Sequence, residues 1–133
     1  MRKKYKAQII GFDTDDVVII SIEGVILYCF CFDVGDDVHI GETWFVDLEI
    51  LDMGLDGIEE SNPENKCAIR VNDSLTYLLQ GIYYADIQSI DIGFLLDLSC
   101  DALYDYGYLD RKNISVTVTR FDVEFIEPVV SEK

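Results

Sequence analysis

The sequence predicts an all-β fold: a single-domain, mainly antiparallel β-barrel, OB-like or sandwich-like, with at most one or two short helices. Three observations predict it. Hydrophobic and polar residues alternate with a period of two along most of the chain, and no run of a dozen residues has helical spacing. Turn-forming residues separate the alternating runs. The 133 residues suffice for one domain, residues 1–133, which at this size buries roughly two thirds of its unfolded surface.

Eight strands are expected along the chain. They are Tyr5–Phe12, Val17–Ile22, Val25–Phe32, Thr43–Leu51, Cys67–Val71, Leu75–Ala85, Ile87–Leu98 and Ile114–Ile126. A DTDD turn joins the first two strands, and Glu23-Gly24 has the composition of a two-residue hairpin loop. These short connections predict an antiparallel meander of three strands at the start of the chain.

The strand Thr43–Leu51 has the clearest alternation. Its apolar face consists of Trp44, Val46, Leu48 and Ile50, and its other face of Thr43, Phe45, Asp47 and Glu49. This pattern is typical of a strand with one face packed and the other mostly in water.

The last expected strand changes the phase of its alternation. Apolar residues occupy even positions from Ile114 to Val118 and odd positions from Phe121 to Phe125. A bulge or a sharp bend near residues 119–120 would produce this change. Strands that bend in this way serve two sheets at the corner of a small barrel.

Two segments do not have strand patterns. Asp52–Lys66 is polar and rich in turn-forming residues, so it is expected to be a long loop with at most one helical turn. Ser99–Asp105 begins with a serine that can cap a helix and has an acidic residue in its first turn, which predicts one short helix.

The net charge restricts the partners of this chain. It is −16, and from Ala7 onward 6 basic residues stand against 26 acidic ones. Such a surface repels nucleic acid and anionic membranes and speeds encounter with a cationic protein, although solubility alone also explains a high charge. We expect a cationic protein partner, no nucleic acid and no membrane; the oligomeric state stays open. The longest apolar runs are shorter than the ~20 residues of a membrane helix, and the basic start lacks the core of a signal peptide, so the cytosol is expected.

The two cysteines of Cys29-Phe30-Cys31 are predicted to be buried thiols. In an extended strand both point to the face of Leu27, and zinc sites use other spacings together with further ligands. Metal binding and redox sensing are the alternatives. Cys67, Cys100 and the single histidine, His39, stand alone in the sequence, so no metal ligand and no cofactor is assigned.

No catalytic residue is assigned. His39 lacks the accompanying motifs of hydrolases, metalloproteases or phosphate-binding loops. The acidic clusters do not match the calcium-binding loop pattern, and the separation of two carboxylates required for glycoside hydrolysis cannot be read from a sequence.

Acidic turns and interleaved tyrosines are the candidate partner-binding residues. Tyrosine rings anchor protein interfaces and carboxylates steer basic partners, although tyrosines also suit half-buried strand positions. The candidates are Asp13, Asp15, Asp16, Asp33, Asp36, Asp37, Tyr104, Asp105, Tyr106 and Tyr108.

The stretches Tyr77–Asp97 and Asp105–Phe125, about a third of the chain, resemble small uncharacterised bacterial all-β proteins, some of them similar to immunity proteins encoded beside toxins. The resemblance rests on general cadence, carries no catalytic residue, and implies a non-enzymatic binding role.

The sequence therefore predicts a non-enzymatic acidic binding or inhibitor protein that engages a cationic protein, for example a nuclease toxin. One alternative is a small-ligand-binding or enzymatic barrel that uses interior carboxylates. Another is a structural or oligomeric module.

Overall fold

The computed structural model describes residues 4–31, 38–60, 66–98 and 107–129, with the backbone only at 51–59. Nine strands and two 3-10 turns lie in this part of the chain, which confirms the all-β prediction. The strands are β1 (Tyr5–Thr14), β2 (Val17–Ile22), β3 (Val25–Phe30), β4 (Thr43–Glu60), β5 (Cys67–Arg70), β6 (Tyr77–Tyr84), β7 (Ser89–Asp91), β8 (Leu95–Asp97) and β9 (Asn113–Pro128). The 3-10 turns are η1 (Ala85–Ile87) and residues 107–109.

Five strands close into a barrel. The meander β1-β2-β3 forms as expected, β1 also pairs with β4, and β4 pairs with β9, all antiparallel. A parallel pair between β3 and β9, at Phe30 and Asp122, closes the ring. The order β3-β2-β1-β4-β9 with its one parallel pair is that of an OB-like barrel, so the barrel prediction is confirmed.

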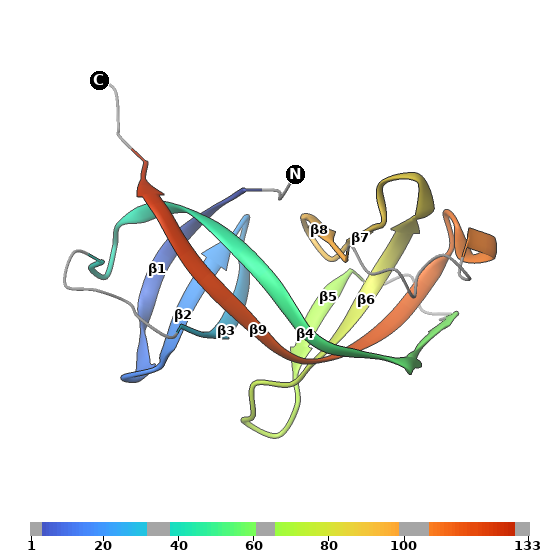
Figure 1. Cartoon of the computed structure of the whole chain (residues 1–133), viewed down its shortest axis with the longest axis horizontal. Coiled ribbons are helices and arrows are strands. Elements are labelled where there is room, and N and C mark those ends of the chain that lie inside the picture. The colour runs from blue at the N-terminus through green and yellow to red at the C-terminus, as the bar shows by residue number, and fades with distance from the viewer. Residues whose placement is uncertain (1–3, 32–37, 61–65, 99–106, 130–133) are drawn as a thin grey trace.

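The remaining strands form a second half around β6, which pairs with the first part of β9, with β5 and with β7. The strand β8 pairs with β7 at the edge of this sheet. Figure 1 shows β4 and β9 crossing the molecule as one long ribbon, with β1, β2 and β3 on its left and β5 to β8 on its right. The ribbon therefore belongs to both halves.

This shared ribbon explains the phase change in β9. Val116 and Val118 are buried where β9 pairs with β6, and Phe121 and Val123 are buried in the barrel part. The pairing with β4 runs without a break through residues 118–125, and its register shifts lie elsewhere, between Phe45 and Val46 and between Met53 and Ile58. Successive residues of a strand point to opposite faces. The change therefore arises because the two halves bury opposite faces of the ribbon, and the bulge expected near residues 119–120 is absent from this pairing.

The prediction of a loop at Asp52–Lys66 is wrong for residues 52–60. Strand β4 continues to Glu60, and after the register shift Ile58 pairs with Val116 and Glu60 with Ile114. Backbone pairing with β9 here outweighs the turn-forming composition. Residues 61–65 lie outside the described part.

The single expected strand Ile87–Leu98 is also wrong. Residues 85–87 form η1, and β7 and β8 follow as a short hairpin. Gln88 and Gly93 have φ angles of 47° and 117°, which a continuous strand does not permit. The helix expected at Ser99–Asp105 lies outside the described residues.

Tyr77 closes the gap between the two halves. Its hydroxyl oxygen accepts a hydrogen bond of 2.8 Å from the backbone N–H of Tyr28, on the side of β3 that pairs with β9 only at Phe30. Its ring packs on that of Phe121, with the centroids 5.6 Å apart. The core is thus continuous from the barrel into the second half. Among the described residues, no helix has the length and hydrophobicity to cross a membrane.

Candidate functional site

Four carboxylates lie on the outer face of the β4–β9 ribbon. Asp47 stands directly opposite Glu124, and Glu49 directly opposite Asp122. The residues between them, including Leu48 and Val123, are buried in the barrel, so the carboxylates of the same strands point outward. We call these four residues, Asp47, Glu49, Asp122 and Glu124, the acidic ribbon.

The acidic ribbon does not stabilise the fold through its cross-strand pairs. Like charges placed directly opposite each other in a sheet are destabilising. Part of the repulsion is offset by Arg120, whose Nε and Nη2 donate to the two carboxylate oxygens of Asp122 at 2.6 and 3.2 Å. The fold therefore holds concentrated negative charge on one face, where it attracts cations.

An apolar surface lies beside the acidic ribbon, on the outer face of β2 and β3. Val17 stands opposite Phe30, and Ile19 opposite Tyr28. These four side chains are half-buried, and Ile26, two positions from Tyr28, is 45% exposed. The segments VVIISI and VILYCF are apolar on both sides, so they show no apolar–polar alternation. Sequence analysis therefore cannot tell which of their faces is exposed.

Two arginines stack on aromatic rings of the apolar surface, and one of them, Arg120, lies at its boundary with the acidic ribbon. The guanidinium of Arg120 lies 4.4 Å from the centroid of the Phe30 ring, while it also binds Asp122. The guanidinium of Arg70 lies 3.7 Å from the centroid of the Tyr28 ring. It also donates hydrogen bonds to the backbone oxygens of Asp73 and Ser74. Both cations are therefore held by groups of this chain, and each covers an aromatic ring.

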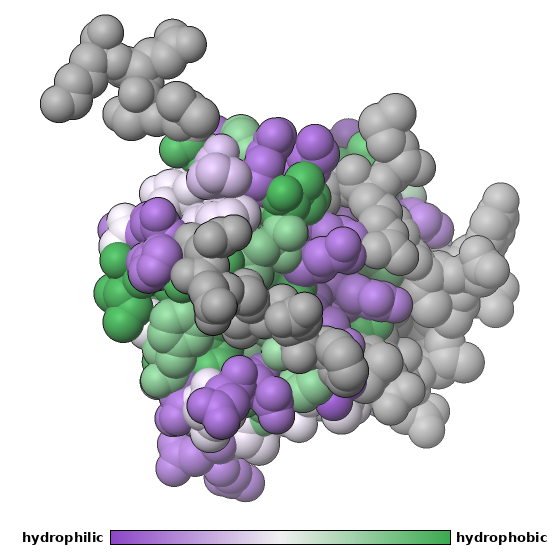
Figure 2. All heavy atoms as spheres, turned by 60° about the vertical axis from the view of Figure 1, so that its left-hand side comes forward, coloured by the Kyte–Doolittle hydropathy of each residue, from purple (hydrophilic) through white to green (hydrophobic). Residues whose placement is uncertain are grey.

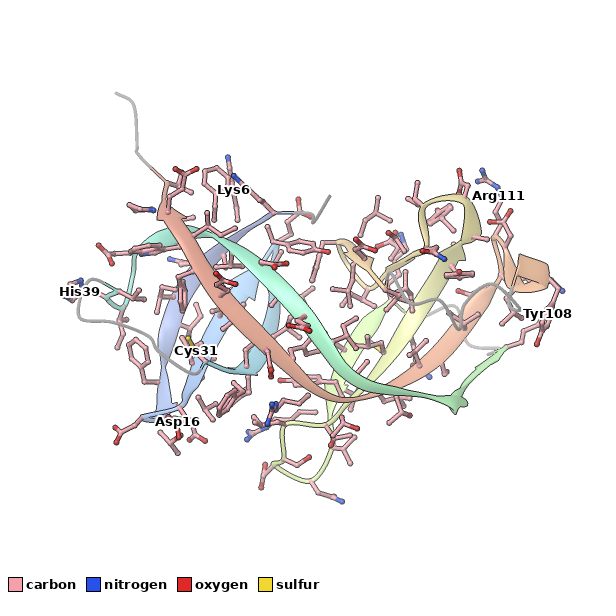
Figure 3. All side chains as sticks on the ribbon, in the orientation of Figure 1. Lys6, Asp16, Cys31, His39, Tyr108 and Arg111 are labelled. Atoms are coloured by element: carbon pink, nitrogen blue, oxygen red, sulfur yellow. The ribbon has the colours of Figure 1, made fainter. Side chains whose placement is uncertain are left out.

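The partner-binding residues expected from the sequence do not form one site in the described part. Asp13, Asp15 and Asp16 are exposed at the turn between β1 and β2, and Tyr108 is 68% exposed in the turn before β9. Figure 3 shows Asp16 and Tyr108 at opposite ends of the molecule. The other candidates lie outside the described residues: Asp33, Asp36, Asp37, Tyr104, Asp105 and Tyr106.

The four residues of the acidic ribbon were missed by sequence analysis. Asp47 and Glu49 were recognised as the wet face of their strand, and Asp122 and Glu124 alternate with apolar residues in the same way. Two alternating pairs of acids are the available signal. Their pairing across strands required the tertiary structure.

The thiols behave as the strand pattern predicts. Cys29 and Cys31 are both buried in the core cluster that includes Leu27, and burial raises the pKa of the Cys29 thiol. Figure 3 shows Cys31 within the barrel half and His39 at its outer end. The backbone N–H of His39 donates to Glu42 Oε1 at 2.7 Å, and this bond is the main cause that lowers the pKa of Glu42. Among the described residues, no group of three potential metal ligands occurs.

One ion pair in the second half gives a pH-dependent stability. Lys66 Nζ lies 2.8 Å from Asp91 Oδ2, and Gly93 N–H donates to Asp91 Oδ1 at 3.0 Å. The hydrogen bond from Lys66 lowers the pKa of Asp91. A carboxyl group whose pKa is lower in the folded state contributes stability above its unfolded pKa, about 3.9, and this contribution disappears as pH falls through the folded pKa.

Replacing Asp91 by asparagine should therefore remove part of the acid sensitivity. At pH 7 we expect Asp91→Asn to lose less than about 1 kcal/mol of stability, because the Lys66 side chain is 52% exposed and solvent screens the pair. Near pH 3 the difference from the unmodified chain should shrink. Urea unfolding at both pH values measures this, with Asp86→Asn as an exposed control. An equal difference at both pH values would contradict the assignment.

Comparison with known proteins identifies a family. The family model described as uncharacterised conserved protein UCP019853 matches residues 3–126. No curated protein and no solved structure matches the chain.

Proposed function

We propose that this chain, which belongs to the family of uncharacterised conserved protein UCP019853, is a non-enzymatic acidic protein that binds and inhibits a cationic protein partner. The concrete candidate is an immunity-like role in the cytosol against a nuclease-type toxin, whose active surface is basic because it binds nucleic acid. The acidic ribbon would cover such a surface by charge complementarity.

The observation that carries this proposal is the cross-strand pairing of like charges. Asp47 with Glu124 and Glu49 with Asp122 oppose folding. Solubility requires net charge, but it does not require acids directly opposite each other on one ribbon. A basic partner would offset this repulsion, which supports binding as a role for the arrangement.

The barrel interior offers less support to a ligand-binding or enzymatic alternative. In the described part of the chain, most of its side chains are apolar, among them Ala7, Ile20, Leu27 and Val46, all fully buried. The buried polar residues of that part are Ser89 and Ser115, and neither is a carboxylate. Among the described side chains, no carboxylate is buried in the core.

Neutralising the acidic ribbon should separate binding from stability. We expect the double variant Glu49→Gln and Glu124→Gln to be as stable as the unmodified chain or more stable by about 0.5 kcal/mol, because one carboxylate of each opposed pair is removed. Its association rate with the partner captured from native lysate should fall about tenfold at low salt. Urea unfolding and surface plasmon resonance measure the two effects.

A matched control carries the same change of charge elsewhere. Asp73→Asn and Asp86→Asn are both exposed in the second half and should leave the association rate nearly unchanged. The proposal fails if the captured partner is acidic or if its binding does not depend on ionic strength. It also fails if the association rate of the control variant falls as much as that of the ribbon variant. A stable oligomer that captures no partner would favour the structural module instead.

A further inference from the structure

The outer face of β2 and β3 is rich in apolar side chains, whose exposure to water is unfavourable. Ile19 and Tyr28 stand opposite each other in the middle of the hairpin, flanked by Val17 with Phe30 on one side and by Ile26 on the other. Ile26 is 45% exposed, although β-branched apolar side chains in a barrel wall normally turn inward. On the barrel side of the molecule, hydrophobic surface lies between clusters of hydrophilic residues (Figure 2).

This apolar face continues into the acidic ribbon without an intervening strand. Phe30 on β3 is the direct neighbour of Asp122 on β9. Arg120 joins the two, since it binds the Asp122 carboxylate and covers the Phe30 ring. Around the barrel wall the order is thus apolar on β2 and β3, then acidic on β9 and β4.

We infer that the two surfaces form one binding site for an amphipathic basic segment of a protein, which places apolar side chains on Ile19 and Ile26 and its lysines or arginines on the acidic ribbon. This inference rests on the proposed function and names the chemistry of its partner. Interfaces derive much of their affinity from a desolvated apolar centre and their approach rate from charge at the rim. A purely polar basic partner would leave the apolar face uncovered.

Charge complementarity selects this occupant over a second copy of the chain. Each copy carries a net charge of −16, and the turns at both ends of the β1–β3 meander carry exposed acids, at Asp13, Asp15 and Asp16 and at Glu23. Two such chains repel each other through their net charge, whereas the same net charge attracts a basic segment.

The test uses two synthetic peptides of equal length and lysine content as probes. In one, leucines alternate with the lysines; in the other, serines replace the leucines. The amphipathic peptide should bind the unmodified chain at least tenfold more tightly than the polar one at low salt, as measured by isothermal titration calorimetry. The double variant Ile19→Thr and Ile26→Thr preserves β-branching and should remove most of this difference while it leaves binding of the polar peptide intact.

Controls separate this inference from the proposed function. Ile69→Thr removes an isoleucine that is 48% exposed on β5 and should leave the tenfold difference unchanged. Equal affinity of the unmodified chain for both peptides would overturn the inference. So would an Ile69→Thr variant that reduces the difference in affinity as much as the Ile19→Thr and Ile26→Thr variant does. Neither result would contradict electrostatic binding. Salt-independent binding of both peptides, or no binding of either, would count against the proposed function as well. A dimer whose formation competes with the peptide would overturn the choice of occupant.

Discussion

Replacing Gly81 by alanine is expected to lower the free energy of unfolding by about 3 kcal/mol, the upper range for forcing extra atoms into a packed core. A Cβ atom at Gly81 would overlap the backbone oxygen of Asp91 and lie 2.7 Å from its carbonyl carbon. These are atoms of the neighbouring strand, since β6 pairs with β7 at Ile82 and Asp91. No rotation of a side chain can relieve the contact, so the strands must separate.

Gly11→Ala is the matched control for this prediction. Gly11 also lies in a strand, but a Cβ there would meet only the Ile19 side chain, at an ordinary distance of 3.9 Å. We expect Gly11→Ala to change the free energy of unfolding by less than about 0.5 kcal/mol. Urea unfolding followed by circular dichroism measures both variants, and equal stability of the two would show that β6 and β7 do not approach as closely as described.

Replacing Phe121 by alanine is expected to lower the free energy of unfolding by about 3 to 5 kcal/mol. Phe121 is fully buried at the point where the ribbon passes from the second half into the barrel, and its ring packs on Tyr77. Truncation of Phe121 leaves a cavity beside the Tyr77 ring, which then loses part of its packing. The hydroxyl oxygen of Tyr77 accepts the hydrogen bond from the Tyr28 N–H, so this bond is weakened as well. Both halves should lose stability together, because this contact lies between them.

Phe125→Ala serves as the comparison on the same strand. Phe125 is only partly buried, and its ring meets Trp44 edge to face with the centroids 5.7 Å apart. Less apolar surface is buried there, so the loss should be clearly smaller than at Phe121. Thermal unfolding observed by Trp44 fluorescence and by circular dichroism should also give one coincident transition for the unmodified chain. A loss at Phe125 as large as at Phe121 would contradict the central position assigned to Phe121.

The stability and binding predictions concern opposite faces of the same ribbon. Phe121 and Val123 hold the ribbon in the barrel from inside, and Asp122 and Glu124, which alternate with them, point outward. Substitutions on the inner face should change stability, whereas those on the outer face should change binding with little loss of stability. This separation makes the proposed function testable without unfolding the protein.

Sequence alone determined most of the strands and the fate of the thiols. Period-two alternation located β1, β2 and β3 within two residues at each end, because one side of each strand must be buried whatever its partner is. The same rule placed Cys29 and Cys31 in the interior. Charge content predicted a surface suited to a basic partner, since net charge is a property of composition.

Only the tertiary structure decided which strands pair, and with it the site. Backbone pairing with β9 extended β4 through a segment whose composition predicts a loop. A local sequence pattern cannot show a hydrogen-bond partner that lies far away along the chain. Pairing also set Asp47 opposite Glu124 and brought Phe30 beside Asp122. Alternation tells which face of a strand is wet, but the neighbours on that face are fixed by register, and register depends on contacts distant along the chain.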